Sequence, residues 1–153
     1  MGKLPLKRNN KYHQGYYNPI NPKKYIGKGD IIYRSGLELK FMLWCDKTDT
    51  IKRWSSETIT VPYYDSVQKK NRLYYVDNFV EIQEGDNIKK YLIEIKPHKQ
   101  TIEPKATKGK RKSNLLYEQL QWVNNHNDKW PAARAFAKNH GMEFIIITEK
   151  ELN

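Results

Sequence analysis

Two stretches of β-favouring residues in the middle of the chain predict a β-hairpin. Residues 73–82 and 90–97 are rich in Tyr, Val, Ile and Phe, which favour strands. A polar break at residues 83–87 separates them and contains Gly85, a residue suited to a tight turn. We therefore expect the two strands to lie antiparallel in one sheet.

Charged residues lie inside both predicted strands. Because side chains alternate along a strand, Leu92, Glu94 and Lys96 share one face of the second strand. A hairpin that brings Asp77 of the first strand near Glu94 and Lys96 gathers two carboxylates and one ammonium at one place. Such a cluster is a place to hold a divalent cation, or else an ordinary cross-strand salt bridge on a solvated face.

An amphipathic helix of about three turns precedes the hairpin, predicted by the spacing of Leu37, Phe41 and Trp44. Ser35 suits its N-cap, and Glu38, three residues later, completes a capping box. Glu38 has two compatible interpretations. It caps the helix near the positive end of the dipole, or it is a third carboxylate at the edge of the charged cluster.

Between this helix and the hairpin, the pattern predicts one more strand. Residues 58–64 alternate and are β-branched, with Pro62 near the end of the strand. Residues 65–72 are polar and are expected to form the turn into the hairpin. Trp54 is expected in the core. Three successive strands would then follow the first helix.

The last third of the chain predicts two helices, over residues 115–123 and 131–140, and a final strand over residues 142–148. The final strand is apolar enough to lie inside a sheet that is covered on both faces. One face of the first of these helices carries three apolar residues: Leu116, Leu120 and Val123.

Length and charge limit the class of protein. A chain of 153 residues can bury a core as one domain without disulfides, and the single Cys45 lies in an apolar run that predicts burial. No signal-like or membrane-spanning apolar run is present, so we expect a soluble protein of a reducing compartment. The net charge of +11 favours a polyanionic partner, most plausibly nucleic acid, over a merely basic soluble protein.

Basic residues gather in two segments. Residues 1–29 contain no acidic residue, several lysines with interleaved tyrosines, and three prolines, which predicts an extended basic arm ahead of a domain over residues 30–153. The alternative for this arm is a solubilising tail. A second basic run, residues 105–112, follows the charged strand. The residues predicted to meet DNA phosphates are Lys23, Lys24, Lys99, Lys108, Lys110, Arg111 and Lys112. His98 and Gln100 are possible further contacts to DNA or to a water.

The order helix, three strands, helices, strand, together with the charged cluster, resembles the PD-(D/E)xK nucleases of the restriction-endonuclease-like superfamily. Asp77 matches the Asp that opens the family's site, and Glu94, Ile95 and Lys96 match its (D/E)xK triplet. Val76 stands where the motif has Pro. The resemblance implies an α/β fold, with an αβββαβ core around a mixed sheet.

A closer resemblance involves residues 33–38, 54–57, 76–77 and 94–101, and extends to the basic, Tyr-rich arm. These segments look like those of the head completion nucleases of T-even tailed phages, which are related to TnsA-type transposon endonucleases. This resemblance implies a virion protein of the head and neck, assembled in the host cytoplasm. It would cut or trim packaged double-stranded DNA and contact head, portal or neck proteins.

The chemistry of the cluster leads to the same activity. Oxygen ligands from Asp77 and Glu94, with the carbonyl of Ile95, suit Mg²⁺, for which Mn²⁺ is expected to substitute. Lys96 would orient the attacking water or offset charge in the transition state, and Glu38 would reach a metal-bound water or a second ion. The predicted catalytic residues are thus Glu38, Asp77, Glu94 and Lys96.

Two other functions remain open from the sequence. One is a DNA-binding structural protein of the phage head that keeps a nuclease fold without cutting. The other is a TnsA-like transposon or repair endonuclease, which shares the chemistry and differs in biology. The intact carboxylate pair and Lys96 favour an active nuclease over the first alternative.

Overall fold

A four-stranded mixed sheet forms the centre of the molecule. The computed structural model describes residues 14–152. The sheet has the order β3 (Ile51–Ser56), β6 (Asn78–Glu84), β7 (Asn87–Ile95) and β8 (Glu143–Ile147). β3 and β6 pair antiparallel, as do β6 and β7, while β8 pairs parallel to β7. The predicted α/β class with a mixed sheet is confirmed.

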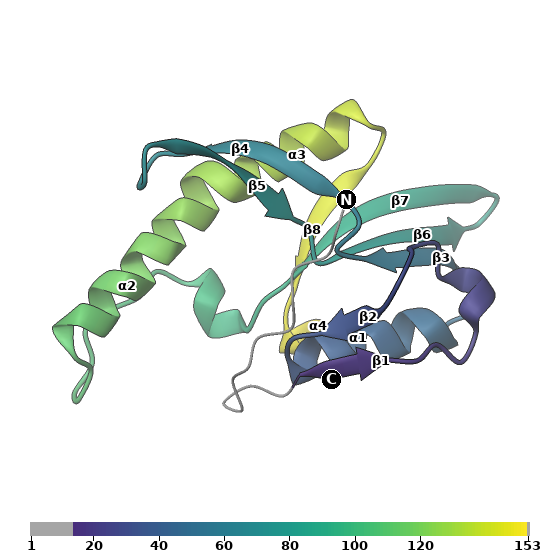
Figure 1. The fold of residues 1–153 in the computed structure, drawn as a ribbon, viewed down its shortest axis with the longest axis horizontal. Coiled ribbons are helices and arrows are strands. Elements are labelled where there is room, and N and C mark those ends of the chain that lie inside the picture. The colour runs from purple at the N-terminus through teal and green to yellow at the C-terminus, as the bar shows by residue number, and fades with distance from the viewer. Residues whose placement is uncertain (1–13, 153) are drawn as a thin grey trace.

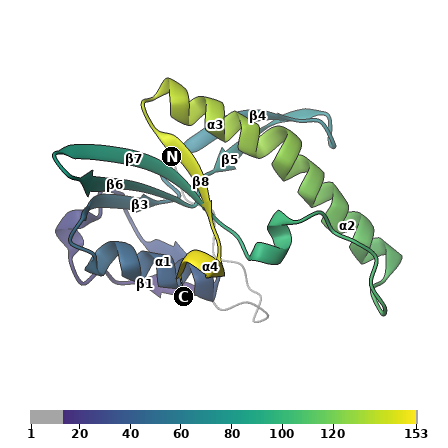
Figure 2. The same ribbon diagram turned by 180° about the vertical axis from the view of Figure 1, so that it is seen from behind.

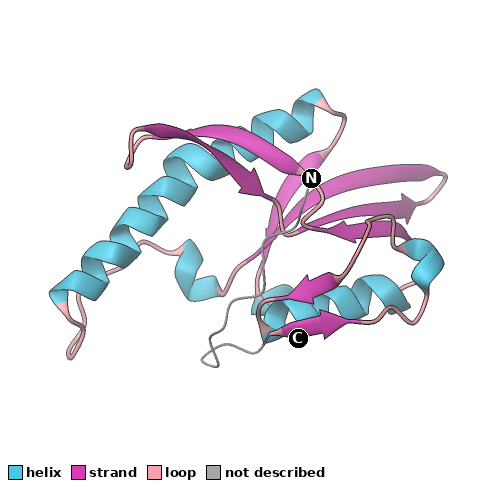
Figure 3. Ribbon diagram, viewed as in Figure 1, coloured by secondary structure: helices cyan, strands magenta, loops and turns pink. Residues whose placement is uncertain are grey.

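Helices cover both faces of this sheet. Helix α1 (Gly36–Lys47) lies on one face, and α3 (Trp130–Asn139) lies on the other, as Figures 1 and 2 show from opposite sides. The order α1, β3, β6, β7, α3, β8 agrees with the predicted αβββαβ order, but its first strand is β3, whereas residues 58–64, the predicted first strand, lie outside this sheet. Figure 3 shows that the strands form the middle layer between the helices.

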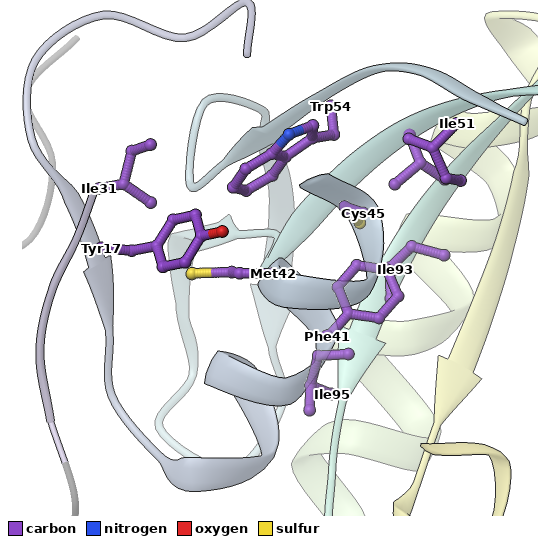
Figure 4. Close-up of a cluster of buried hydrophobic side chains, with 10 residues drawn as sticks. Tyr17, Ile31, Phe41, Met42, Cys45, Ile51, Trp54, Ile93 and Ile95 are labelled. Carbon is purple, nitrogen blue, oxygen red and sulfur yellow. The ribbon is translucent and has the colours of Figure 1, made fainter. Parts of the chain in front are cut away.

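The core on the α1 side confirms the predicted burial of Trp54 and Cys45, both of which are fully buried. Figure 4 shows Phe41, Met42 and Cys45 of α1 packed with Trp54 and Ile93. The predicted stripe of Leu37, Phe41 and Trp44 is only partly right, because Trp44 is 41% exposed. The buried face of α1 includes Met42 in place of Trp44, because the N-terminal segment packs on that side of the helix.

The core on the α3 side is formed by Trp130, Ala133 and Ala137 of α3 packed with Leu92 of β7 and Phe144 of β8. Leu92 thus lies on the opposite face of β7 from Ile93 and Ile95, as the alternation predicted. The prediction that the last strand lies inside the sheet is wrong, since β8 is an edge strand with Glu143 exposed.

The predicted strand over residues 73–82 is interrupted at Val76 and Asp77. Residues before the interruption form β5 (Lys70–Tyr75), which pairs with β4 (Thr60–Asp65) as a separate two-stranded sheet. The chain then enters the main sheet as β6. Two backbone hydrogen bonds hold the crossing, from Val76 N–H to the Ile59 carbonyl and from Glu57 N–H to the Asp77 carbonyl. The β4–β5 hairpin is therefore an insertion between two strands of the core.

The turn between β6 and β7 agrees with the prediction. Gly85 adopts φ = 61° at the turn, a conformation that favours glycine. The last residues of β7 lead into a short 3₁₀ helix, η2 (His98–Thr101), and then into a long loop.

Helix α2 (Lys112–Val123) projects away from the sheet (Figure 1). A π-helical turn, η3 (Asn124–Lys129), joins it to α3, and a short helix α4 (Glu149–Leu152) follows β8. The predicted apolar face of α2 does not enter the core, because Leu116 is 56% exposed and Leu120 is 41% exposed. No helix within residues 14–152 is long and apolar enough to cross a bilayer.

Part of the predicted irregular arm has regular structure. β1 (Gly15–Tyr17) pairs antiparallel with β2 (Ile31–Tyr33), and a 3₁₀ turn, η1 (Pro22–Lys24), lies between them. Tyr17 is buried against the α1 side of the core. The prolines of this segment thus stand in a turn of a folded segment. The rest of the predicted arm, residues 1–13, lies outside the described residues.

Asp46 of α1 fastens this N-terminal segment. Its buried carboxylate accepts hydrogen bonds from the Tyr17 hydroxyl and from the backbone N–H groups of Ile20 and Asn21. Burial alone would raise the pKa of Asp46, but these three hydrogen bonds outweigh it and leave the pKa below its ordinary value. Asp46 therefore holds the segment as an ionised acceptor.

We expect Asp46→Ala to destabilise the protein by roughly 3 kcal/mol, since it leaves one buried donor and two partly buried donors without an acceptor. For a domain of this size, the thermal midpoint would fall by about 6–12 °C. The measurement is thermal unfolding followed by circular dichroism. Asp49→Ala is the matched control, because Asp49 is exposed two residues beyond α1, and a surface change of this kind should stay within about 0.5 kcal/mol. Equal midpoints for the two variants would contradict this role of Asp46.

Candidate active site

Asp77, Glu94 and Lys96 meet where β7 ends and the chain crosses between the two sheets. Oδ2 of Asp77 accepts a hydrogen bond of 2.7 Å from the backbone N–H of Ile95. Nζ of Lys96 lies 3.7 Å from Oε1 of Glu94. The carboxylate of Glu94 is buried, with 3% of the residue exposed, on the α3 side of the sheet. The structure thus brings the three predicted residues together.

Burial raises the pKa of both Asp77 and Glu94. For each carboxyl the positive charges of Lys96 and Lys129 act in the opposite direction, and the Ile95 N–H does so for Asp77 as well. Each carboxyl therefore resists ionisation until a cation or a proton compensates it. The cluster therefore favours any positive group that can enter it.

Glu38 lies beside this pair. Its Oε2 accepts from the Arg34 N–H at 2.8 Å, while its own N–H donates to Oγ of Ser35 at 3.1 Å. Ser35 is the N-cap, as predicted. The Glu38 carboxylate, however, accepts from the N–H of Arg34 and not from the N–H of Ser35. Burial, and then the charge of Asp77, raises the pKa of Glu38 to about 8. Glu38 thus borders the helix cap without closing the predicted capping box, and it lies close enough to Asp77 for their charges to interact.

An ion pair not foreseen from the sequence supports the site. The guanidinium of Arg34 binds the carboxylate of Glu57 through two contacts, at 2.6 and 3.0 Å. Glu57 has φ = 56°, unusual for a residue with a side chain, and its N–H holds the Asp77 carbonyl. The two residues lie 23 positions apart in different elements, so no local spacing could have revealed the pair.

Lys129 is the second residue that the sequence did not reveal. It ends the π-helical turn η3, and its ammonium lies 4.5 Å from the centre of the Tyr74 ring. Burial lowers the pKa of Lys129, and the nearby charges of Glu94 and Asp77 oppose this shift. Thirty-three residues separate it from Lys96, and only the fold brings the two cations to the same carboxylates. No sequence pattern marks this lysine.

The carboxylates leave one buried acceptor open. Within residues 14–152, Oε2 of Glu94 has no hydrogen-bond partner. The same residues contain no group of three His, Cys, Asp or Glu side chains arranged as a metal site. The acidic pair is therefore an incomplete set of oxygen ligands, which suits a hard cation that keeps water or phosphate oxygens in its remaining positions.

The predicted DNA-binding residues divide into two groups. Lys24 is not available in the predicted way, because its ammonium donates to the carbonyls of Asp46 and Thr48 at 3.1 and 2.7 Å at the end of α1. Lys110 forms an ion pair with Glu118 at 2.8 Å. The side chains that remain exposed are Lys23, Lys99, Lys108, Arg111 and Lys112.

The two possible residues after the site strand lie in η2. The backbone N–H of His98 donates to the carboxylate of Glu149 at the start of α4, which anchors η2. Gln100 is exposed, and its N–H closes the turn on the Pro97 carbonyl.

Most of the chain, including the residues of this site strand, matches a known protein family. Residues 48–149 match the family described as TnsA-like endonuclease N terminal. The chain belongs to the TnsA-like endonuclease family. The matched region contains Asp77, Glu94, Lys96 and Lys129, while Glu38 and Arg34 precede it.

One relative resembles nearly the whole chain. The head completion nuclease of Enterobacteria phage T4 is 35% identical over 144 residues, which cover 92% of this chain and 93% of the relative. Together with membership of the TnsA-like endonuclease family, this similarity places the chain among the nucleases.

We expect the metal-free protein to lose stability as pH rises from about 4.5 to about 8. The Glu38 pKa of about 8 in the folded protein exceeds its ordinary value of 4.5, so the unfolded chain ionises first and gains stability over this range. Thermal midpoints in EDTA across this range test the point. Glu38→Gln keeps an acceptor for the Arg34 N–H and should flatten the profile. Parallel profiles for the two proteins would contradict the raised pKa.

Proposed function

We propose that this protein is a metal-dependent deoxyribonuclease that hydrolyses phosphodiester bonds, with Mg²⁺ as its cofactor and Mn²⁺ as a substitute. The observation that carries the proposal is the buried Glu94 carboxylate, which has an unpartnered oxygen beside Asp77 and Lys96. A buried carboxylate without a full set of partners is costly, and a divalent cation removes that cost.

The side chains of Asp77 and Glu94 and the carbonyl of Ile95 would hold the cation. A bound Mg²⁺ would supply a polarised phosphate oxygen and a more acidic water. These three groups offer oxygen ligands only, the kind that Mg²⁺ prefers, and the Ile95 N–H fixes the Asp77 carboxylate in place.

The two lysines have separate roles in the proposed reaction. Lys96 borders Glu94 and would orient the attacking water or offset negative charge as the phosphate becomes more crowded. Lys129 approaches the same carboxylates from the α3 side and would bind a non-bridging phosphate oxygen. Glu38, whose carboxyl group has a pKa of about 8, would hold a proton beside Asp77.

Duplex DNA would be held mainly through its phosphates. The net charge of +11 and the exposed residues Lys23, Lys99, Lys108, Arg111 and Lys112 support this mode of binding. Lysine contacts to phosphates position a duplex without reading its bases, so we expect weak sequence selectivity.

The proposed biological role is the trimming or cutting of packaged phage DNA when the head is completed and joined to the tail. The similarity to the T4 head completion nuclease over nearly the full chain supports this role. It implies head, portal or neck proteins as partners, and a location in the virion after assembly in the host cytoplasm. The match to TnsA-like endonucleases supports a second candidate, cutting at transposon ends or in repair. Retention of Asp77, Glu94 and Lys96 argues against a structural protein without activity.

We expect the purified protein to cut plasmid DNA with Mg²⁺ or Mn²⁺ and not with EDTA. Asp77→Asn and Lys96→Ala should each lower the rate by roughly 10²- to 10³-fold while DNA binding persists. Linear and supercoiled plasmids, compared on gels, would separate trimming at ends from internal cutting.

Matched controls keep this test specific. Asp86→Asn changes an exposed Asp in the β6–β7 turn, and Lys90→Ala changes an exposed Lys near the other end of β7. Both should cut like the unchanged protein. A folded protein that binds DNA but never cuts it, with either metal, would refute the nuclease proposal and favour the structural alternative.

Lys129→Met should also lower the cleavage rate, by roughly 10²-fold, because it removes a cation from the place where phosphate charge would gather. Lys138→Met on the exposed side of α3 is the control. Single-turnover kinetics at saturating protein measure the rate apart from binding. An unchanged rate in Lys129→Met would exclude the proposed contact.

A further inference from the structure

A cleft lies beside the candidate active site, between the β4–β5 hairpin and the helix formed by α2 and η3. Its cavity volume is about 380 Å³. Figures 1 and 2 both show the hairpin and α2 side by side at the end of the molecule away from α1. Neither the family match nor the proposed chemistry gives this cleft a role.

Aromatic and apolar side chains form much of its lining. Tyr75 comes from the hairpin and Tyr117 from α2, and Tyr117 is 65% exposed. Leu73 and Leu120 line the same cleft and are also exposed. Exposed aromatic rings in a cleft offer flat surfaces on which nucleotide bases stack.

The charge of the cleft is positive. Two cations, Arg72 and Lys129, line it against one carboxylate, Asp65. The Arg72 guanidinium also donates to Oε1 of Gln68 at 2.5 Å. Oδ1 of Asp65 accepts from the backbone N–H groups of Val67 and Gln68 at 2.9 Å each, and Oδ2 lies 3.9 Å from Arg72. The cleft therefore suits an anionic occupant.

Two polar atoms of lining residues have no partner within residues 14–152. They are the hydroxyl of Tyr74 and Oδ1 of Asn124, and both atoms are buried. Both atoms are closed off from the cleft, so the exposed rings and the cations of its lining are what indicate an occupant.

Lys129 joins the cleft to the candidate active site. It lines the cleft, while its charge acts on Glu94 and Asp77. A strand with its phosphate at the carboxylates could thus continue past Lys129 into the cleft. The volume falls in the usual range for small-molecule pockets, roughly 300–1,000 Å³, which suits one or two unstacked nucleotides and not a double helix.

We propose that this cleft binds an unpaired segment of the DNA substrate next to the bond that is cut. The inference rests on the proposed nuclease function and extends it: the favoured substrate is a duplex with a single-stranded end, gap or flap. Tyr117 and Tyr75 stack on its bases, and Arg72 and Lys129 bind its phosphates.

Binding without cutting tests the inference. Fluorescence anisotropy in EDTA compares a labelled blunt duplex with the same duplex carrying a short thymidine tail at its 5′ or 3′ end. We expect at least one tail to tighten binding by roughly 5- to 100-fold, the contribution of one stacked base. Tyr117→Ala should remove this preference and leave affinity for the blunt duplex unchanged. Tyr64→Ala should keep the preference, because Tyr64 is an exposed tyrosine of the same hairpin that does not line the cleft.

The outcomes separate this inference from the nuclease proposal. A preference for tails that Tyr117→Ala abolishes supports the cleft even if no metal restores cutting, in which case only the nuclease proposal fails. Equal binding of blunt and tailed duplexes, or a preference that Tyr117→Ala leaves intact, overturns the inference and leaves a protein segment as the alternative occupant. A photoreactive thymidine in the tail gives an independent measurement, since its crosslinks should fall on Tyr75 or Tyr117.

Discussion

The position of Asp77 between two sheets is the constraint on which the rest of the site depends. The chain leaves the β4–β5 hairpin and enters the main sheet at this residue. Its carbonyl is held by Glu57, and its carboxylate is held by the N–H of Ile95 on the neighbouring strand. Because both its carbonyl and its carboxylate are held, Asp77 stays next to the end of β7, where Glu94 lies. The crossing between the two sheets therefore also positions the two carboxylates.

Opposite charges are distributed unevenly in this protein. The chain carries 28 Lys and Arg against 17 Asp and Glu, yet three acidic residues, Glu38, Asp77 and Glu94, lie around the end of β7, and Glu94 is buried. Burial raises the pKa of all three carboxyl groups. The metal-dependent nuclease that we propose needs both a basic surface for DNA and an acidic site for its cation.

Features that depend on neighbouring positions could be predicted from the sequence. Alternation along β7 placed Glu94 and Lys96 on one face, and the cap of α1 placed Glu38 near the first turn. The interruption at Val76 could not be predicted, because β-favouring residues continue through it and the cause is pairing with residues far along the chain. The exposure of Leu116 and Leu120 could not be predicted either, because an apolar stripe on a helix does not indicate whether another element packs against it.

The same limit applies to the support of the site. Arg34 and Glu57, and likewise Lys129, act on Asp77 or Glu94 only through tertiary contacts, so their roles appear once the elements are packed. Lys24 shows the reverse error: a lysine in a basic segment suggested a phosphate contact, whereas its ammonium completes the end of α1. The charge of a sequence indicates what kind of partner its surface can attract. It does not indicate which lysines and arginines are already engaged in contacts within the protein.

The π-helical turn between α2 and α3 has an evolutionary consequence. A π turn holds one residue more than the α turn it replaces, so deleting a single residue from Asn124–Lys129 would restore a continuous α-helix. Because the wide π turn accommodates the extra residue locally, α2 would keep its rotation relative to α3, and Tyr117 would still face the β4–β5 hairpin. A one-codon change could therefore alter the wall of the cleft near Asn124 and Lys129 while the sheet and the position of Tyr117 stay the same.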